Sequence, residues 1–499
     1  MDYQTPNRIS IQPLNVHLMI NLHSLSSYTL IAGLFLLGLI QIDRQSYKRH
    51  FQYLGQDTIE IVESKVPSKI FTIICHGYAG SKEMMRQLAF DVVNAGSNAV
   101  IFDFIGHGAN SQRLINNPTE LSGTTQQLVD QVINVIDLLK LKYGSDIKLN
   151  LIGHSMASDI VIRASEKQNI SSIAAISPYS TKVTENFPKD LLLTSGQFEK
   201  HLRNHSLKFT KLIVTDADEN VEYSNGLVRR KASYTKNTGH VSVIYSPQTS
   251  ATITEWFNLN NGHRTLWSTQ IIWILLGLTM ITYGLSRLKL ATINYYENTR
   301  VSSVKSIIVG ISSTTIALSS SYIDYELFTI FGFGSVAAYF GIVGATTLLV
   351  CREIWENSEK FHFYPFIKLL AAFSILVILI NYFIGSFFIA NHRIFAFLIM
   401  IIPLTIFCVA IEKLISMSAT IIALFIRILP LVGFSILLAI FPEKYGVMFT
   451  TVPIYIFYFL VFGYIGKIQR KSVGSYTIGT LHGIFLAFAL AATNPIFSI

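Results

Sequence analysis

Residues 147–158 read Ile-Lys-Leu-Asn-Leu-Ile-Gly-His-Ser-Met-Ala-Ser, and this stretch decides the fold of the first half of the chain. A short apolar segment runs into the pattern Gly-x-Ser-x-Ala, and a helix-forming stretch follows. This order is typical of a tight strand-to-helix turn that exposes a serine hydroxyl on a strained backbone. Small residues are needed around the serine because the helix passes close to the strand, and Gly153 and Ala157 meet that need. Since the N-terminus of the following helix favours developing negative charge, we predict Ser155 as a nucleophile.

Two upstream stretches have the same strand-then-turn character. Residues 71–82 form a β-branched apolar run that ends in His-Gly, with Gly77 as the motif glycine. A loop of this kind supplies a backbone N–H to an oxyanion hole, so we expect the N–H of Tyr78 to act together with that of Met156. Residues 99–108 read as the next buried parallel strand, which ends in a glycine-rich turn.

The order of three motifs carries a resemblance to a known superfamily. His-Gly at 76–77, Asp-x-x-Gly-His-Gly at 103–108 and Gly-His-Ser-Met-Ala at 153–157 follow one another at ordinary spacing. In this combination, roughly residues 55–258 resemble the α/β-hydrolase fold superfamily. The resemblance implies an α/β fold with a mostly parallel sheet and a serine nucleophile that needs no cofactor. It also implies an acid and then a histidine downstream of the serine.

The histidine that the resemblance implies is His240. Residues 232–235 read as a last short strand, and a Gly-His step follows it at 239–240. The superfamily keeps its general base in the loop after the final strand. His240 would take the proton from Ser155 and later return it to the leaving group.

Two regions compete to supply the acid. Residues 190–199 read as a strand followed by Gly-x-x-acid, the superfamily's pattern, with Glu199 where aspartate is commoner. Residues 211–218 read as another short strand that ends in Asp216 and Asp218, which lie nearer to His240 in the sequence. We favour Glu199 and keep Asp216 and Asp218 as alternatives. Either acid would fix the imidazole tautomer and stabilise its cation.

Three scattered cysteines, Cys75, Cys351 and Cys408, form no Cys-x-x-Cys pair. We interpret them as small buried apolar residues rather than as a disulfide framework. We predict no metal and no cofactor. Only about thirteen residues separate the predicted strand at 173–177 from the one that begins at Leu191, so we also expect no large lid over the site.

Composition indicates that the chain is also a membrane protein. Hydrophobic residues make up 51% of it and charged residues 14%, and the mean hydropathy is +0.44. We predict a polar segment over 1–24, an uncleaved transmembrane anchor over 25–42, a hydrolase-like domain over 51–258 and a transmembrane bundle of about eight helices over 266–497. The expected later spans lie near 266–286, 304–323, 327–350, 365–390, 394–412, 418–441, 446–466 and 476–497.

Charge separates between the two halves. Over 51–258 the lysines and arginines equal the aspartates and glutamates, so the net charge of +9 belongs to the rest of the chain. This indicates membrane topology rather than nucleic-acid binding. Basic residues in the short loops favour a cytoplasmic location for the side away from the domain. We therefore expect an extracytoplasmic hydrolase domain on a bacterial inner or plasma membrane, although Arg44, Lys48 and Arg49 beside the anchor favour the reverse. We interpret Arg427 and His482, both inside spans, as structural.

These features together predict a membrane-embedded serine hydrolase of the carboxylesterase or lipase type, with a peptidase as the alternative. It would cleave an acyl ester, thioester or amide through an acyl-enzyme, and its partners would be the lipid bilayer and a small acyl-ester, lipid or peptide substrate. Two alternatives stay open. The bundle could be a transporter or channel with a regulatory hydrolase-like module, or a membrane acyltransferase that uses the same serine. The sequence does not specify the oligomeric state.

Overall fold

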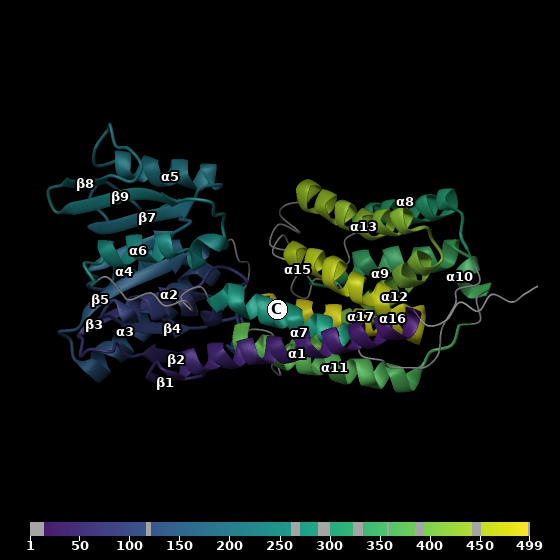
Figure 1. Cartoon of the computed structure of the whole chain (residues 1–499). Helices are drawn as coiled ribbons and strands as arrows, with labels where there is room; N and C mark the ends of the chain where they lie inside the picture. The colour runs from purple at the N-terminus through teal and green to yellow at the C-terminus, as the bar shows by residue number, and fades with distance from the viewer. Residues whose placement is uncertain are drawn as a thin grey trace, which may run out of the picture.

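The computed structural model describes residues 14–115, 121–260, 270–287, 300–322, 333–356, 359–384, 389, 393–441 and 451–497. They form two parts, an α/β domain built on one sheet and a bundle of apolar helices beside it (Figure 1). Helix α1 (Leu14–Gln45) precedes the α/β domain in the sequence and α7 (Gln270–Ser286) follows it. The domain is therefore inserted between two helices of the bundle.

A nine-stranded sheet is the framework of the α/β domain, in the order β1-β2-β4-β3-β5-β6-β7-β9-β8. The central strands are parallel, whereas β1, β2 and β8 pair antiparallel at the two edges. The strands are β1 (Arg49–Leu54), β2 (Asp57–Val62), β3 (Ile70–Cys75), β4 (Asn98–Phe102), β5 (Lys148–His154), β6 (Ser172–Ile176), β7 (Asp190–Gly196), β8 (Glu222–Asn225) and β9 (Val228–Thr235). The mostly parallel α/β fold predicted from the sequence is confirmed.

Helices cover both faces of the sheet, so its central strands are buried on both sides. One layer holds α3 (Gln126–Tyr143), α4 (Met156–Ser165) and α5 (Lys200–Lys211), and the other holds α2 (Lys82–Asn94) and α6 (Pro247–Trp256). In β3, Ile73 packs with the first layer and Ile74 with the second, and both are fully buried. Successive residues of a strand point to opposite faces, which explains why β3 is almost entirely apolar.

Because the central strands are parallel, their carboxyl ends share one edge of the sheet. The turns after β3, β4, β5, β7 and β9 therefore gather there, and these are the turns to which the sequence assigns chemistry. Residues 177–189, between β6 and β7, contain no helix or strand, so no lid domain is inserted at that position.

The bundle contains several helices long and apolar enough to cross a membrane. Among the described residues, five candidate spans are Leu25–Gln45, Phe363–Ile384, Ile394–Ser416, Thr420–Ile440 and Ser475–Thr493, and Gln270–Ser286 and Gly334–Val350 are shorter apolar helices. The helices after α7 are α8 (Ser303–Ser320), α9 (Phe333–Val350), α10 (Glu353–Glu356), α11 (Phe363–Ile384), α12 (Ile394–Ser416), α13 (Thr420–Ile440), α15 (Val452–Phe457), α16 (Gly463–Val473) and α17 (Ser475–Thr493). A π-helical turn, Tyr458–Phe462, joins α15 to α16. Residues 446–450 of the expected span 446–466 lie outside the described residues.

A group of charged and polar side chains meets inside the bundle around Glu412. Glu412 accepts from Arg427 at 3.1 Å and from Arg470 at 3.0 Å, and the Nδ1 atom of His482 lies 3.6 Å from its carboxylate. These contacts join α12, α13, α16 and α17. The prediction that Arg427 and His482 are structural agrees with this arrangement, because an unpaired charge among apolar helices is costly.

The end of the chain returns to the α/β domain. The Ile496 N–H donates to Gly106 O at 3.0 Å, and Ile496 O accepts from the Leu114 N–H at 2.9 Å. Arg393, which directly precedes α12 and is fully buried, donates to Gly106 O at 3.2 Å and to Gly108 O at 3.4 Å. The loop after β4 is therefore docked on the bundle.

Candidate active site

The turn between β5 and α4 places Ser155 on a strained backbone. Ser155 has φ +54° and ψ −117°, a conformation that residues other than glycine rarely adopt. Its N–H donates to Ile176 O of β6 at 2.8 Å, which fixes the turn to the sheet. A Cβ atom at Gly153 would lie 2.3 Å from Ala157 O, so the close approach of α4 to β5 requires glycine there. Such strain is common where a side chain has to be presented for chemistry.

His240 bridges Ser155 and Glu199. Its Nε2 atom lies 2.9 Å from Ser155 Oγ, and its Nδ1 atom lies 2.6 Å from Glu199 Oε1. The three residues come from the turns after β5, β9 and β7, so the shared carboxyl edge of the sheet brings them together. The His240 side chain is 43% exposed and that of Glu199 only 8%. A solvent-accessible imidazole is thus held by a buried carboxylate.

Glu199 is held as a carboxylate by three donors. Its Oε2 atom accepts from the Gly196 N–H at 2.6 Å and from Ser177 Oγ at 2.7 Å, while Oε1 faces His240. Burial acts to raise the pKa of Glu199, but these hydrogen bonds outweigh it and keep the pKa below its usual value. An ionised Glu199 favours the tautomer of His240 that carries its proton on Nδ1, which leaves Nε2 free to accept from Ser155.

The alternative acids lie elsewhere. Asp216 and Asp218 are exposed in a turn after α5, and neither is among the partners of His240. The strand predicted over 211–218 is wrong, because α5 extends to Lys211 and the rest of that segment forms turns.

The two backbone groups predicted for the oxyanion hole lie beside Ser155. The Met156 N–H is the first of α4, and the first N–H groups of a helix have no acceptor within it. Among the described residues, the Tyr78 N–H likewise has no backbone acceptor. A Cβ atom at Gly77 would lie 3.1 Å from Ser155 Cβ, so glycine lets the loop after β3 approach the serine closely.

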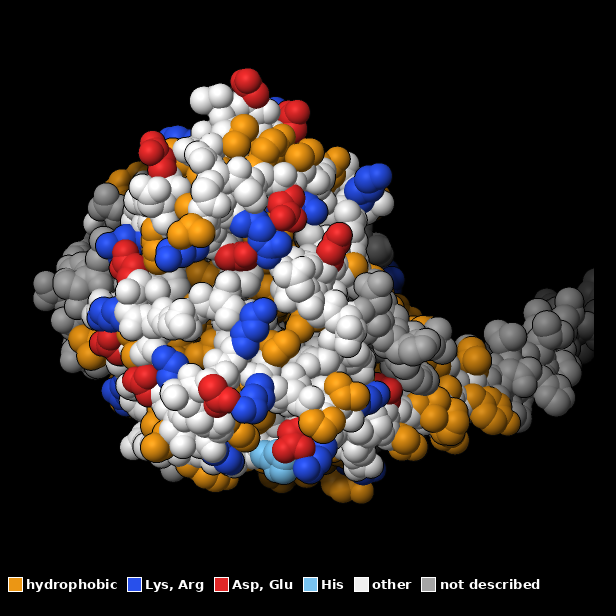
Figure 2. Space-filling view, turned by 90° about the vertical axis from the view of Figure 1, so that its left-hand side faces the viewer, with side chains coloured by type: hydrophobic (Ala, Val, Ile, Leu, Met, Phe, Trp, Pro, Cys, Tyr) orange, Lys and Arg blue, Asp and Glu red, His pale blue; other side chains and the backbone are white. Residues whose placement is uncertain are grey.

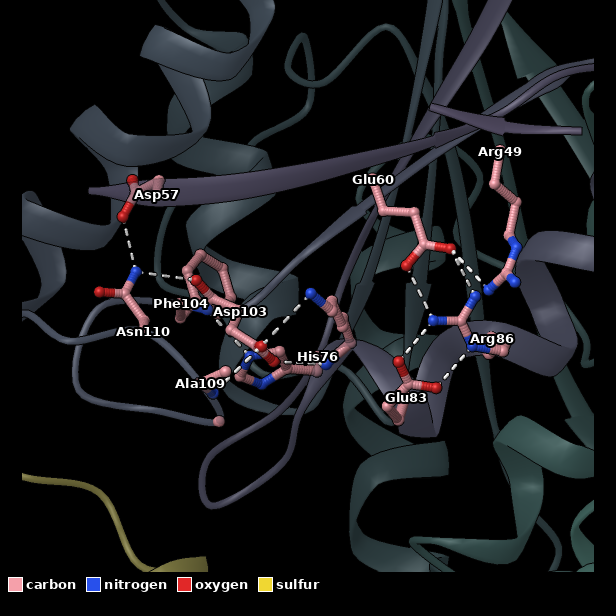
Figure 3. A network of polar contacts seen from close by, with 12 residues as sticks. Arg49, Asp57, Glu60, His76, Glu83, Arg86, Asp103, Phe104, Ala109 and Asn110 are labelled. Atoms are coloured by element: carbon pink, nitrogen blue, oxygen red, sulfur yellow. Dashed lines mark hydrogen bonds and ion pairs between the residues drawn. The ribbon is translucent and has the colours of Figure 1, made fainter. Parts of the chain in front are cut away.

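Buried groups hold the loops after β3 and β4 together (Figure 3). His76 donates from Nδ1 to Gly77 O at 2.8 Å and accepts at Nε2 from the Phe104 N–H at 3.0 Å. This pattern requires the neutral ring, in agreement with burial, which lowers the pKa of His76. Asp103 accepts from the Lys82 N–H at 2.8 Å, which ties the start of α2 to the loop after β4.

His107 links the loop after β4 to Tyr78. Its Nδ1 atom donates to Ile105 O at 2.9 Å, and its ring lies edge-on to the Tyr78 ring with centroids 5.6 Å apart. Burial lowers the pKa of His107 to about 3, so the ring is neutral at physiological pH. The Tyr78 side chain is therefore in contact with the loop after β4, and that loop docks on the bundle.

The sequence analysis assigns no contact to His154, whereas the structure shows a direct hydrogen bond from it to the His240 loop. His154 Nε2 donates to His240 O at 2.8 Å. Burial, and then the charge of His240, lower the pKa of His154 to about 4, so it acts as a neutral donor. Its position inside the Gly-His-Ser motif was the one available signal.

A pair of histidines on α5, away from Ser155, has a spacing that is also seen in metal sites. His201 and His205 lie one turn apart on α5, but within the described part of the chain no group of three potential ligands includes them. His205 stacks on Tyr179 and meets Phe209 edge-on. We therefore assign no metal to this pair.

One family of known proteins matches the part of the chain that carries these residues. A family model described as serine aminopeptidase, S33, matches residues 67–240, a segment that contains Ser155 and Glu199 and ends at His240. Residues 67–240 belong to the α/β-hydrolase superfamily. The α/β domain is called the hydrolase domain below.

Solved structures resemble the hydrolase domain. They include TT1662 from Thermus thermophilus (15% identity, 42% of this chain and 97% of that chain, TM-score 0.33) and an α/β serine hydrolase homologue from Coxiella burnetii (17%, 42% and 94%, 0.31). A third is XC6422 from Xanthomonas campestris, described as an α/β serine hydrolase without lid (13%, 42% and 90%, 0.30). No curated protein matches the chain.

Proposed function

We propose that the chain is a membrane-embedded serine hydrolase that cleaves an acyl ester, thioester or amide bond. The observation that carries the proposal is the position of His240, within hydrogen-bond distance of both Ser155 and Glu199. Nucleophile, base and orienting acid in this geometry are the arrangement that activates a serine hydroxyl. The strained backbone of Ser155 supports the same role.

The reaction would proceed in two halves. In the first, His240 Nε2 takes the proton of Ser155 Oγ as the oxygen attacks the substrate carbonyl, and the oxyanion is stabilised by the N–H groups of Tyr78 and Met156. Collapse of the tetrahedral intermediate breaks the bond to the leaving group, which receives the proton from His240. In the second half, water attacks the acyl-serine with His240 again as the base, and the acid product leaves.

The membrane part of the proposal rests on the apolar helices and on charge. In the part of the chain that the structure describes, five helices are long and apolar enough to span a bilayer. The loops on the side away from the hydrolase domain carry most of the basic residues of the bundle, as expected for cytoplasmic loops. We propose that the hydrolase domain lies outside the cytoplasm.

Fluorophosphonate labelling tests the activated serine. Full-length protein should be labelled, and Ser155→Ala and His240→Ala should lose the label, whereas Ser165→Ala, at the far end of α4, should keep it. A charged, membrane-impermeant fluorophosphonate should also label intact cells if the domain is extracytoplasmic. Folded wild-type protein that stays unlabelled in detergent would reject the activated serine. Labelling only after the membrane is opened would reject the sidedness.

A further inference from the structure

The carboxyl edge of the sheet, which carries the candidate active site, faces the bundle. At β4 this edge is docked through Gly106 and Leu114, which bond to Ile496 beyond the end of α17. Arg393 reaches the same loop from the start of α12. Figure 1 shows the helical bundle on the side of the sheet where these segments meet.

A second contact holds the same orientation. The Gln270 N–H at the start of α7 donates to Gln87 Oε1 of α2 at 3.0 Å. Gln270 also accepts through its side chain from Arg44 of α1 at 3.0 Å, and Arg44 donates to Phe383 O of α11 at 3.0 Å. The helices α1, α7 and α11 all carry candidate spans or apolar segments. The hydrolase domain is therefore held against the ends of the helices that would lie in the membrane.

Ser155 lies close to this junction. It follows β5, and only β3 separates β5 from the docked β4. Neighbouring strands are about 4.8 Å apart, so the serine turn lies roughly 10 Å along the edge from the end of β4. The hydroxyl thus belongs to the part of the domain nearest the proposed membrane surface.

Exposed apolar side chains lie in the turns at this edge of the sheet, beside the residues of the candidate site in the sequence. Phe198, next to Glu199, is 71% exposed, Val241, next to His240, is 49% exposed, and Tyr179, in the turn after β6, is 59% exposed. They come from three different turns and remain exposed with the bundle in place. We name Tyr179, Phe198 and Val241 the apolar rim.

The opposite face of the domain differs in character. Figure 2 shows the side away from the bundle, where Lys, Arg, Asp and Glu side chains are spread among smaller hydrophobic areas. Two exposed apolar residues lie at the amino ends of the strands, opposite the carboxyl edge: Leu227, 83% exposed in the turn before β9, and Leu141, 86% exposed near the end of α3. They provide matched controls, since they are as exposed as the rim but lie at the other end of the strands.

We propose that the substrate of Ser155 is an acyl ester of a bilayer lipid, taken from the leaflet on which the domain sits. This rests on the proposed function above. The apolar rim would contact the acyl chain at the membrane surface, while the ester carbonyl reaches the serine. Ser155 Oγ would form the new ester as the bond to the lipid alcohol breaks, and His240 would protonate that alcohol. Water would then release the fatty acid.

The test compares two esters on the same full-length protein in phosphatidylcholine vesicles. One is a water-soluble short-chain p-nitrophenyl ester, and the other is a fluorogenic long-chain ester lipid embedded in the vesicles. Removing a large apolar side chain from contact with lipid weakens the interaction by about tenfold or more. Phe198→Ser combined with Val241→Ser should therefore lower kcat/KM for the embedded ester about tenfold more than for the soluble ester. Leu227→Ser combined with Leu141→Ser should leave the ratio of the two activities unchanged.

The outcomes separate the two proposals. Hydrolysis of the soluble ester with an equal effect of the rim variant on both esters would overturn the lipid substrate but keep the serine hydrolase. The lipid substrate is likewise overturned if wild-type protein turns over the soluble ester and leaves the embedded ester intact. Absence of turnover of both esters, together with absence of fluorophosphonate labelling, would overturn the proposed function itself. Loss confined to the embedded ester in the rim variant would support the lipid substrate.

Discussion

Replacing Arg393 by methionine tests whether the bundle supports the catalytic loops. The guanidinium is fully buried and donates to four carbonyl oxygens, those of Ala491 at 3.1 Å, Asn494, Gly106 at 3.2 Å and Gly108 at 3.4 Å. Methionine keeps the length and apolar stem of the side chain but donates no hydrogen bond. The variant would therefore remove the guanidinium donor from these carbonyls while preserving most of the packing, and Gly106 O would keep only the Ile496 N–H.

The size of the effect follows from these bonds. A hydrogen bond from a charged donor contributes about 1.5–3 kcal/mol, although the two to the loop are long. Burial of the guanidinium, which lowers the pKa of Arg393 to about 10, has a desolvation cost that offsets part of the free energy contributed by these hydrogen bonds. We expect a net loss of about 3 kcal/mol from docking of the loop, because removing one partner leaves buried polar groups unpaired. That loss corresponds to roughly a 100-fold rise in the population with the loop undocked.

Hydrogen exchange can measure this population directly. The Leu114 N–H bonds to Ile496 O and is protected only while the tail is docked, so its exchange should accelerate by roughly 100-fold. Fluorophosphonate labelling of Ser155 should slow as well, since His107 in this loop lies against Tyr78. Arg300→Met, an exposed arginine on the bundle, is the matched control. Unchanged exchange over residues 103–114 in the folded Arg393 variant would refute the coupling.

Two further predictions concern the site and its pH dependence. Glu199→Gln keeps the shape of the side chain but loses its charge and should slow fluorophosphonate labelling by about 10²–10⁴-fold, with partial recovery in Glu199→Asp. Burial lowers the pKa values of His107 and His154 to about 3 and about 4, so the unfolded chain binds more protons and stability falls as pH drops below about 6.5. Each of these two histidines should lower the free energy of unfolding by about 2 kcal/mol between about pH 8 and pH 5. The thermal unfolding temperature should therefore fall less on acidification in His154→Gln than in the wild type.

Local sequence patterns were sufficient to predict much of the fold of the hydrolase domain. The serine turn depends on residues adjacent in the chain, and the strict need for a small residue at Gly153 could be inferred from that geometry. The choice of Glu199 came from the resemblance to the superfamily, whose pattern places Gly-x-x-acid after a strand. The strand predicted over 211–218 failed for a non-local reason. Its apolar run resembles a strand, but β7 pairs directly with β9 along its whole length, so no strand fits between them.

The return of the chain's end to the hydrolase domain has no local signature. Phe497 forms a parallel bridge with Leu114, although the two residues lie far apart in the sequence. The same contact explains how an inserted domain keeps one orientation. Its two connections, α1 and α7, pack closely, since a Cβ atom at Gly33 would lie 2.8 Å from Gly277 O. Two adjacent connections alone would leave the domain free to turn about them. The tail and Arg393 add a third attachment at the end of β4, which fixes the carboxyl edge, and with it Ser155, toward the helix ends.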